Sequence, residues 1–395
     1  MSTHRTDNRR ICLECGNHNL PGHATLCPVC GSKAGQIIDF RNSDDRLLHA
    51  APRLMEERCQ AGLEDLVGGL EFVVINTEPE HQSGAVEELL ARTGLHVTDA
   101  FEDSASRAVV LQSPGSADVL VTSRKGVSPF AAFTDYPKSR HLPTTRLETF
   151  AFSCRDVTEY ERIQRSRGIG FMSDAPVSGR QFKFIQTTPS LYTGISIGLI
   201  ERSGSEHSYR LPESVDLDWH FEKPALAYLG NIGRLDHTAT RVRAKERDEA
   251  ILEFINLTNY RFEFAIYVKS LNSITNVARL SANDFAMVFT SGITPFADLE
   301  TSGPTEQFTH NYGPRTHHLA WDTEAIDEVF AGLVDDGQEF LLDLVGSPDE
   351  GLKQTFSVMS PHTLLINEYI HRFGEFDGFF TKGNVTLLTK AAGNQ

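Results

Sequence analysis

The sequence predicts an α+β protein in which a small zinc ribbon precedes four similar modules arranged as two pairs. Two observations lead to this fold class, and composition and length agree with it. Four cysteines stand in two CxxC pairs within the first 30 residues, and the rest of the chain matches itself across two halves. Hydrophobic residues make up 40%, with 25 Phe, which is typical of a folded chain. At 395 residues the chain has room for more than one core.

The charge balance and the hydropathy argue against two kinds of partner. Lys and Arg number 37 against 53 Asp and Glu, and the formal net charge of −16 repels phosphate backbones and anionic membrane surfaces. The first residues lack the apolar core of a signal peptide, and no apolar run reaches the roughly 18 residues that cross a bilayer. We therefore expect a cytoplasmic protein with no membrane partner and no general affinity for nucleic acid.

Residues 1–40 are predicted to form the zinc ribbon. Its ligands are four cysteines, each pair followed by a glycine: Cys12, Cys15, Cys27 and Cys30. Four thiolates at this spacing suit a tetrahedral structural Zn(II), because a closed four-sulfur site leaves no open position for a substrate. The ribbon is then a folding staple or a docking module for a protein partner. Contact with nucleic acid is supported only by a few basic residues: Arg5, Arg9, Arg10 and Lys33.

Residues 41–66 have apolar side chains at helical spacing around Pro52 and are predicted to form a helical connector. Beyond them the chain divides into two matching halves, 67–225 and 226–395. Three pairs of segments carry the match: 70–95 with 235–260, 146–152 with 315–321, and 196–202 with 366–372. Each pair includes a strand, and helix-forming stretches follow the first two, so we expect four modules of similar design in two pairs.

The halves differ at three positions that matter for chemistry. Phe72, Thr149 and Gly198 of the first half stand at the places of His237, His318 and Glu368 of the second. Each difference replaces a residue that is not a metal ligand with one that is. Two imidazoles and one carboxylate form the facial triad that leaves open positions on Fe(II), although zinc, manganese and nickel accept the same ligands. The second half is therefore predicted to be a metal-binding catalytic pair and the first half a metal-free pair.

His317 is a rival to His318 for a place in this triad. Successive side chains of a strand alternate sides, so we expect only one of the two to face the site, and the match between the halves favours His318. The same alternation places Glu368 on one face with Ile366 and Ile370. A carboxylate on such an apolar face needs a partner such as a cation.

The second half resembles the 4-hydroxyphenylpyruvate dioxygenase family of the vicinal oxygen chelate superfamily. The segments 354–356, 365–372 and 378–384 are similar to the family's strand ending in a glutamate ligand, its arginine and its glycine-rich lid. The resemblance implies βαβββ modules with three iron ligands, His237, His318 and Glu368. It also implies roles for three further residues: Gln354 as a substrate contact, Phe380 as an aromatic wall and Asn384 as a residue that orders the lid. Phe379 is the alternative to Phe380 for the aromatic wall. The alternative role of Gln354 is to form hydrogen bonds with polar groups of the backbone.

The resemblance implies a non-heme Fe(II)-dependent dioxygenase that binds a 2-oxo acid, an aryl one by expectation, together with dioxygen. The reaction would couple oxidative decarboxylation to oxygenation of the same substrate. Departures from the family pattern, such as Val385 and the short span between His318 and Glu368, concern the substrate more than the metal. Two alternatives stay open: another metal-dependent enzyme of the superfamily (extradiol dioxygenase, lyase or isomerase), or a non-catalytic ligand-binding protein. The first pair is either a scaffold or the surface of a homo-oligomer.

Overall fold

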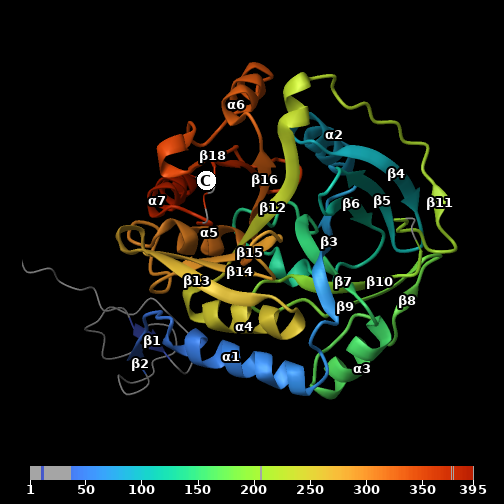
Figure 1. The fold of residues 1–395 in the computed structure, drawn as a ribbon, viewed down its shortest axis with the longest axis horizontal. Helices are drawn as coiled ribbons and strands as arrows, with labels where there is room; N and C mark the ends of the chain where they lie inside the picture. The colour runs from blue at the N-terminus through green and yellow to red at the C-terminus, as the bar shows by residue number, and fades with distance from the viewer. Residues whose placement is uncertain (1–9, 13–36, 205–206, 375, 377, 395) are drawn as a thin grey trace, which may run out of the picture.

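Two curled β-sheets and the helices around them form the body of the structure, a computed structural model that describes residues 10–12, 37–204, 207–374, 376 and 378–394 (Figure 1). The first sheet contains β3 (Val67–Asn76), β4 (His96–Glu102), β5 (Ser106–Gln112), β6 (Asp118–Arg124), β7 (Arg146–Cys154), β8 (Val177–Ser178), β9 (Phe182–Gln186), β10 (Ser196–Arg202) and β11 (Val215–Asp216). The second contains β12 (Ile232–Arg241), β13 (Arg261–Val268), β14 (Ser273–Arg279), β15 (Ala286–Gly292), β16 (Arg315–Thr323), β17 (Val345–Ser347), β18 (Leu352–Phe356) and β19 (Ile366–Arg372). The predicted mixed α+β class is confirmed.

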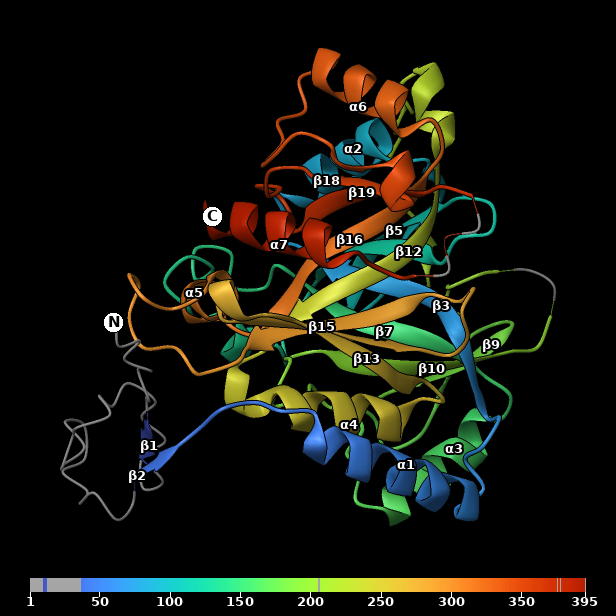
Figure 2. The ribbon, with the colours of Figure 1, turned by 60° about the vertical axis from the view of Figure 1, so that its left-hand side comes forward.

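The helices are short segments between and around the strands: α1 (Asp45–Gln60), α2 (Gln82–Arg92), α3 (Val157–Ser166), α4 (Arg247–Leu257), α5 (Pro304–Tyr312), α6 (Ile326–Asp335) and α7 (Lys382–Ala391). Helices α1, α3 and α4 lie together along one end of the two sheets (Figures 1 and 2). Within the described part of the chain, no helix combines the length and the apolar character needed to span a bilayer.

The strand orders of the two sheets are related. They run β11-β4-β5-β6-β3-β7-β10-β9-β8 and β13-β14-β15-β12-β16-β19-β18-β17. At each centre an antiparallel pair, β3 with β7 or β12 with β16, is extended by a parallel strand, β10 or β19. Residues aligned in sequence lie side by side in the same way: Phe72, Ala151 and Gly198 in the first sheet, and His237, Ala320 and Glu368 in the second. The sequence match between the halves therefore corresponds to equivalent places in the two sheets.

One apolar core joins the two sheets. It includes Phe150 and Phe152 of β7 together with Leu235 and Trp321 of the second half. The ring of Phe152 lies 5.3 Å from the ring of Tyr260, in an edge-on contact between the halves. Because alternate residues of each strand point away from this core, the opposite faces of the central strands are free to build a separate interior within each sheet.

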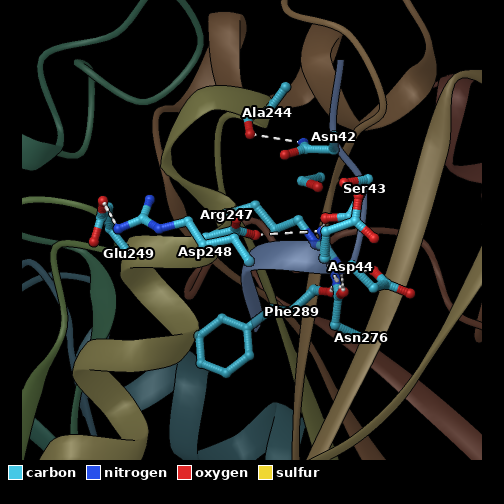
Figure 3. Close-up of polar contacts among 12 residues, drawn as sticks. Asn42, Ser43, Asp44, Ala244, Arg247, Asp248, Glu249, Asn276 and Phe289 are labelled. Carbon is cyan, nitrogen blue, oxygen red and sulfur yellow. Dashed lines mark hydrogen bonds and ion pairs between the residues drawn. The ribbon is translucent and has the colours of Figure 1, made fainter. Parts of the chain in front are cut away.

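A buried arginine ties the segment before α1 to the second half. The guanidinium of Arg247 in α4 donates to the carbonyl of Ser43 at 2.8 Å, contacts the carboxylate of Asp44, and donates to Asn276 Oδ1 at 2.7 and 2.9 Å (Figure 3). The side-chain amide of Asn42 donates to two backbone carbonyls of the same half, at 2.7 and 2.8 Å. These bonds fix residues 42–44 against the half for which a metal site is predicted.

Most of the predicted zinc ribbon lies outside the described residues. This holds for Cys15, Cys27 and Cys30, and for Cys12 only the backbone, at the end of β1, is described. β1 (Arg10–Cys12) pairs antiparallel with β2 (Ile37–Asp39). The zinc site stays a prediction.

Candidate metal centre

His237 of β12, His318 of β16 and Glu368 of β19 converge in the interior of the second sheet. All three side chains are buried, and their ligand atoms lie within 4.8 Å of one another. Glu368 Oε2 is 3.2 Å from His237 Nε2 and 3.1 Å from His318 Nε2. The three predicted ligands, 131 residues apart from first to last, are brought together because β12, β16 and β19 are neighbours in the sheet.

Several polar atoms at this point lack hydrogen-bond partners. Both carboxylate oxygens of Glu368 and the Nε2 atom of His237 have none among the described residues. Burying such groups uncompensated is unfavourable by several kcal/mol. A divalent cation placed between the three side chains would satisfy them, since imidazole and carboxylate are ligands of Fe(II), manganese and zinc. The donor set therefore fits a metal ion.

The protonation of the two histidines is consistent with this fit. Burial lowers the pKa of His318 well below its usual range, and neighbouring positive side chains lower it further, so its imidazole is neutral and able to ligate. Burial also acts to lower the pKa of His237, but the negative charge of Glu368 beside it and the bond to Asp236 outweigh burial and raise the pKa to about 9. A cation at the centre would replace the proton on His237, so metal binding is expected to release a proton at neutral pH.

Asp236 and Arg372 hold the imidazole of His237 on its Nδ1 side. Nδ1 of His237 lies 2.7 Å from Asp236 Oδ2, and Arg372 donates to the two oxygens of Asp236 at 2.7 and 3.0 Å. Burial raises the pKa of Asp236, but the bond to His237 and the charge of Arg372 outweigh it and hold the pKa far below its usual value. The carboxylate stays ionised, keeps the proton on Nδ1 and leaves Nε2 for the metal. Sequence reasoning assigned these two residues no role, although the acid directly before the histidine was an available sign.

Aromatic side chains fill the equivalent place in the first sheet. The ring of Phe72 lies 5.8 Å from that of Phe184 and 4.9 Å from that of Tyr209. A Cβ at Gly198 would lie 2.7 Å from the ring of Phe184, so glycine is needed for that ring to fit. Within the described ranges, the second sheet holds the one group of three metal-ligating side chains.

A β-bulge in β16 places both neighbouring histidines on the same cavity. The pairing of β16 with β12 skips His317, which is the extra residue of the bulge. His317 and His318 consequently both line the cavity beside the centre, and their Nδ1 atoms lie 2.9 Å apart. The expectation that only one of them faces the site is wrong, because the bulge interrupts the alternation on which it depended. His318 is the one that joins His237 and Glu368.

The centre opens into a cavity of about 50 Å³. Gln354 lines it, is fully buried, and has no hydrogen-bond partner for either amide atom among the described residues. Phe380 also lines it, with its ring 5.1 Å from that of His237. The ring of Phe379 is 5.4 Å from His237 but packs against the guanidinium of Arg372, outside the lining. The cavity holds only a few water molecules, so an organic ligand enters only if part of the wall moves.

Helix α7 forms one side of that wall. Val385, Leu388 and Thr389 of this helix line the cavity. Asn384, the residue expected to order the lid, is buried but lies outside the lining, with its side-chain amide against Gly346 of β17 and its Nδ2 unpartnered among the described residues. Gln354 and Phe380 thus line the cavity, whereas the side chain of Asn384, in α7 itself, lies against Gly346.

Comparison with solved structures shows the fold. The chain is similar to a triple mutant of 4-hydroxymandelate synthase from Streptomyces coelicolor, with a TM-score of 0.63 and 17% identity, over 83% of this chain and 98% of that one. It is also similar to a fusion of a xylose isomerase-like TIM barrel with 4-hydroxyphenylpyruvate dioxygenase, with a TM-score of 0.57 and 12% identity, over 88% of this chain and 57% of that one. No protein-family profile matches the chain, and no curated protein matches it in sequence. The chain has the vicinal oxygen chelate fold of 4-hydroxyphenylpyruvate dioxygenase-like proteins.

Proposed function

We propose that the chain is a non-heme Fe(II)-dependent dioxygenase that acts on a 2-oxo acid. The resemblance in the sequence predicts that this acid carries an aryl group. In the overall reaction the substrate loses carbon dioxide, one atom of dioxygen enters the new carboxylate, and the other enters the oxidised position of the same molecule. The observation that supports the proposal most strongly is the buried group of His237, His318 and Glu368 within a fold of this class. Its Glu368 oxygens and His237 Nε2 have no hydrogen-bond partner among the described residues.

Each residue of the site has a part in this proposal. Fe(II) bound by the three ligands would offer its remaining positions to the 2-oxo acid and dioxygen and supply the redox chemistry. Asp236 orients His237 so that Nε2 points to the centre. Gln354 has a free amide donor and acceptor for a polar group of the substrate, and Phe380 offers a ring face to an aryl group. The closed wall excludes water from the reaction.

Oxygen uptake tests the proposal. Anaerobically purified, Fe(II)-loaded protein is mixed with oxygen and a set of aryl and alkyl 2-oxo acids, and carbon dioxide is measured alongside. We expect uptake and carbon dioxide release in equal amounts for at least one acid, and loss of both in Glu368→Gln. Glu71→Gln, which changes a partly exposed carboxylate of the first sheet, serves as the control and should retain them. Iron-loaded protein that consumes no oxygen with any acid of the set would contradict the proposal.

His317 favours a second candidate, extradiol ring cleavage, which needs an acid–base histidine beside the metal. Its side chain lines the cavity next to His318. Oxygen uptake with a catechol but without carbon dioxide would identify this reaction. A lyase or isomerase would turn over without oxygen, and a binding protein would show no turnover.

We also propose that Cys12, Cys15, Cys27 and Cys30 bind a structural Zn(II). The ribbon would then serve as a folding staple or as a docking module for a protein partner.

A further inference from the structure

The cavity beside the metal centre contains a buried arginine that has no counter-ion among the described residues. Arg241 lies in β12, four residues beyond His237, is 5% exposed, and lines the same cavity as His318 and Glu368. Its Nη1 atom is buried without a hydrogen-bond partner. Burial alone lowers the pKa of Arg241 to about 9, with no contribution from a nearby carboxylate, so the side chain is still a cation at neutral pH.

Two other buried arginines, Arg247 and Arg146, are held by the protein itself. Arg247 contacts the carboxylate of Asp44, and Arg146 donates to three backbone carbonyls. Arg241 instead lies over the ring of Phe308, at 4.5 Å. A cation–π contact offsets only part of the unfavourable free energy of removing a guanidinium from water. The fold therefore leaves a positive charge uncompensated at this point of the cavity.

Neutral polar groups of the same cavity are also unpartnered. Thr290 of β15 is the neighbour of Arg241 across the strand pair, lines the cavity, and has a hydroxyl without a hydrogen-bond partner. Gln354 contributes an amide with both atoms free. Ala239 and Val288 make the wall near them apolar. Buried polar groups are nearly always satisfied, so a cation, a hydroxyl and an amide facing one cavity indicate a ligand with an anionic group.

We propose that Arg241 binds a second carboxylate of the substrate, at the end opposite to the 2-oxo acid group. This inference rests on the proposed function, because it places the 2-oxo acid group at His237, His318 and Glu368. His237 and Arg241 are four residues apart on one face of a strand, so their Cα atoms are roughly 13 Å apart. Once the wall of the small cavity has moved to admit a ligand, that spacing leaves room for a group about the size of a benzene ring between two acidic ends. A guanidinium removed from water binds a carboxylate through paired, charge-assisted hydrogen bonds.

Two matched acids test the proposal: 4-carboxyphenylpyruvate and phenylpyruvate, titrated calorimetrically into anaerobic protein with and without Fe(II). We expect the wild type to bind the 4-carboxy acid about 10- to 100-fold more tightly. Arg241→Gln should abolish this preference, and Arg241→Lys should retain part of it. Arg234→Gln, an exposed arginine of the same strand, is the control and should keep it. Equal affinities in the wild type, or a preference that survives in Arg241→Gln, would overturn the proposal.

Thermal unfolding separates ligand binding from a structural role. An unpaired buried cation destabilises a fold, so ligand-free Arg241→Gln should unfold at the same temperature as the wild type or at a higher one. A clearly lower unfolding temperature would mean that Arg241 serves the fold and would overturn the proposal.

Failure of the proposed function gives a different result. If the protein binds no iron or consumes no oxygen, the ratio of the two affinities is measured on the metal-free form. A preference there that depends on Arg241 still supports the anion site. If neither acid binds any form, the anion site is overturned as well.

Discussion

Replacing Asp236 with Asn tests whether the contact behind His237 sets the metal affinity of the centre. The carboxylate lies 2.7 Å from His237 Nδ1 and accepts two bonds from Arg372, so it both orients the imidazole and makes it a better ligand. Asparagine keeps the shape but loses the charge, and it presents an amide N–H to one of two donors. Changes of this kind lower metal affinity about 10- to 100-fold, or about 1.4 to 2.7 kcal/mol.

The assay is competition with a chromophoric chelator for Fe(II), or for Co(II) as a stand-in, under anaerobic conditions. The matched control is Glu71→Gln, which changes the equivalent acid of the first sheet, 3.9 Å from Arg202, whereas the three predicted ligands lie in the second sheet. We expect the control to keep the wild-type affinity. If Asp236→Asn binds metal within twofold of the wild type, the argument that this carboxylate tunes the centre is refuted.

Three further substitutions test the fold and the cavity wall. Arg247→Met should lower the free energy of unfolding by about 3 kcal/mol in denaturant titrations, because it removes a buried guanidinium from its ion pair with Asp44. The control Arg46→Met, at an exposed ion pair, should change it by less than about 1 kcal/mol. Glu306→Gln should lower it by about 1 to 3 kcal/mol, because the carboxylate accepts three backbone N–H groups at 2.9 Å and an amide has only one accepting oxygen; an unchanged denaturation midpoint would contradict this. Phe380→Ala should weaken phenylpyruvate binding about two- to tenfold without changing the iron content, and an unchanged affinity would remove the ring from the binding wall.

The three predicted ligands could be located from the sequence because the two halves share one strand register. Phe72 and Gly198 occupy, relative to Ala151, the places that His237 and Glu368 occupy relative to Ala320. A difference at an aligned position therefore marks a difference at one place in space. In the first sheet the aromatic rings around Phe72 fill the equivalent place, so that place holds no metal ligands.

Other features depend on geometry that a strand pattern does not carry. The bulge at His317 changes which side chains face the cavity, and one skipped pair leaves no mark in the residue order. The lack of a counter-ion for Arg241 cannot be predicted from the sequence, because it depends both on the burial of the guanidinium and on which side chains surround it. The position of Asn384 depends on how α7 turns against Gly346, which helix-forming residues alone do not determine.

The most direct test of the central claim is elemental analysis of protein purified anaerobically with iron supplied. We predict about one iron per chain in the wild type, loss of that iron in the double variant His237→Ala, Glu368→Ala, and full retention in the control His362→Ala. Zinc near one per chain should persist in all three proteins if the four cysteines bind it. A wild type that holds no metal sensitive to the double variant would contradict a metal centre at these residues.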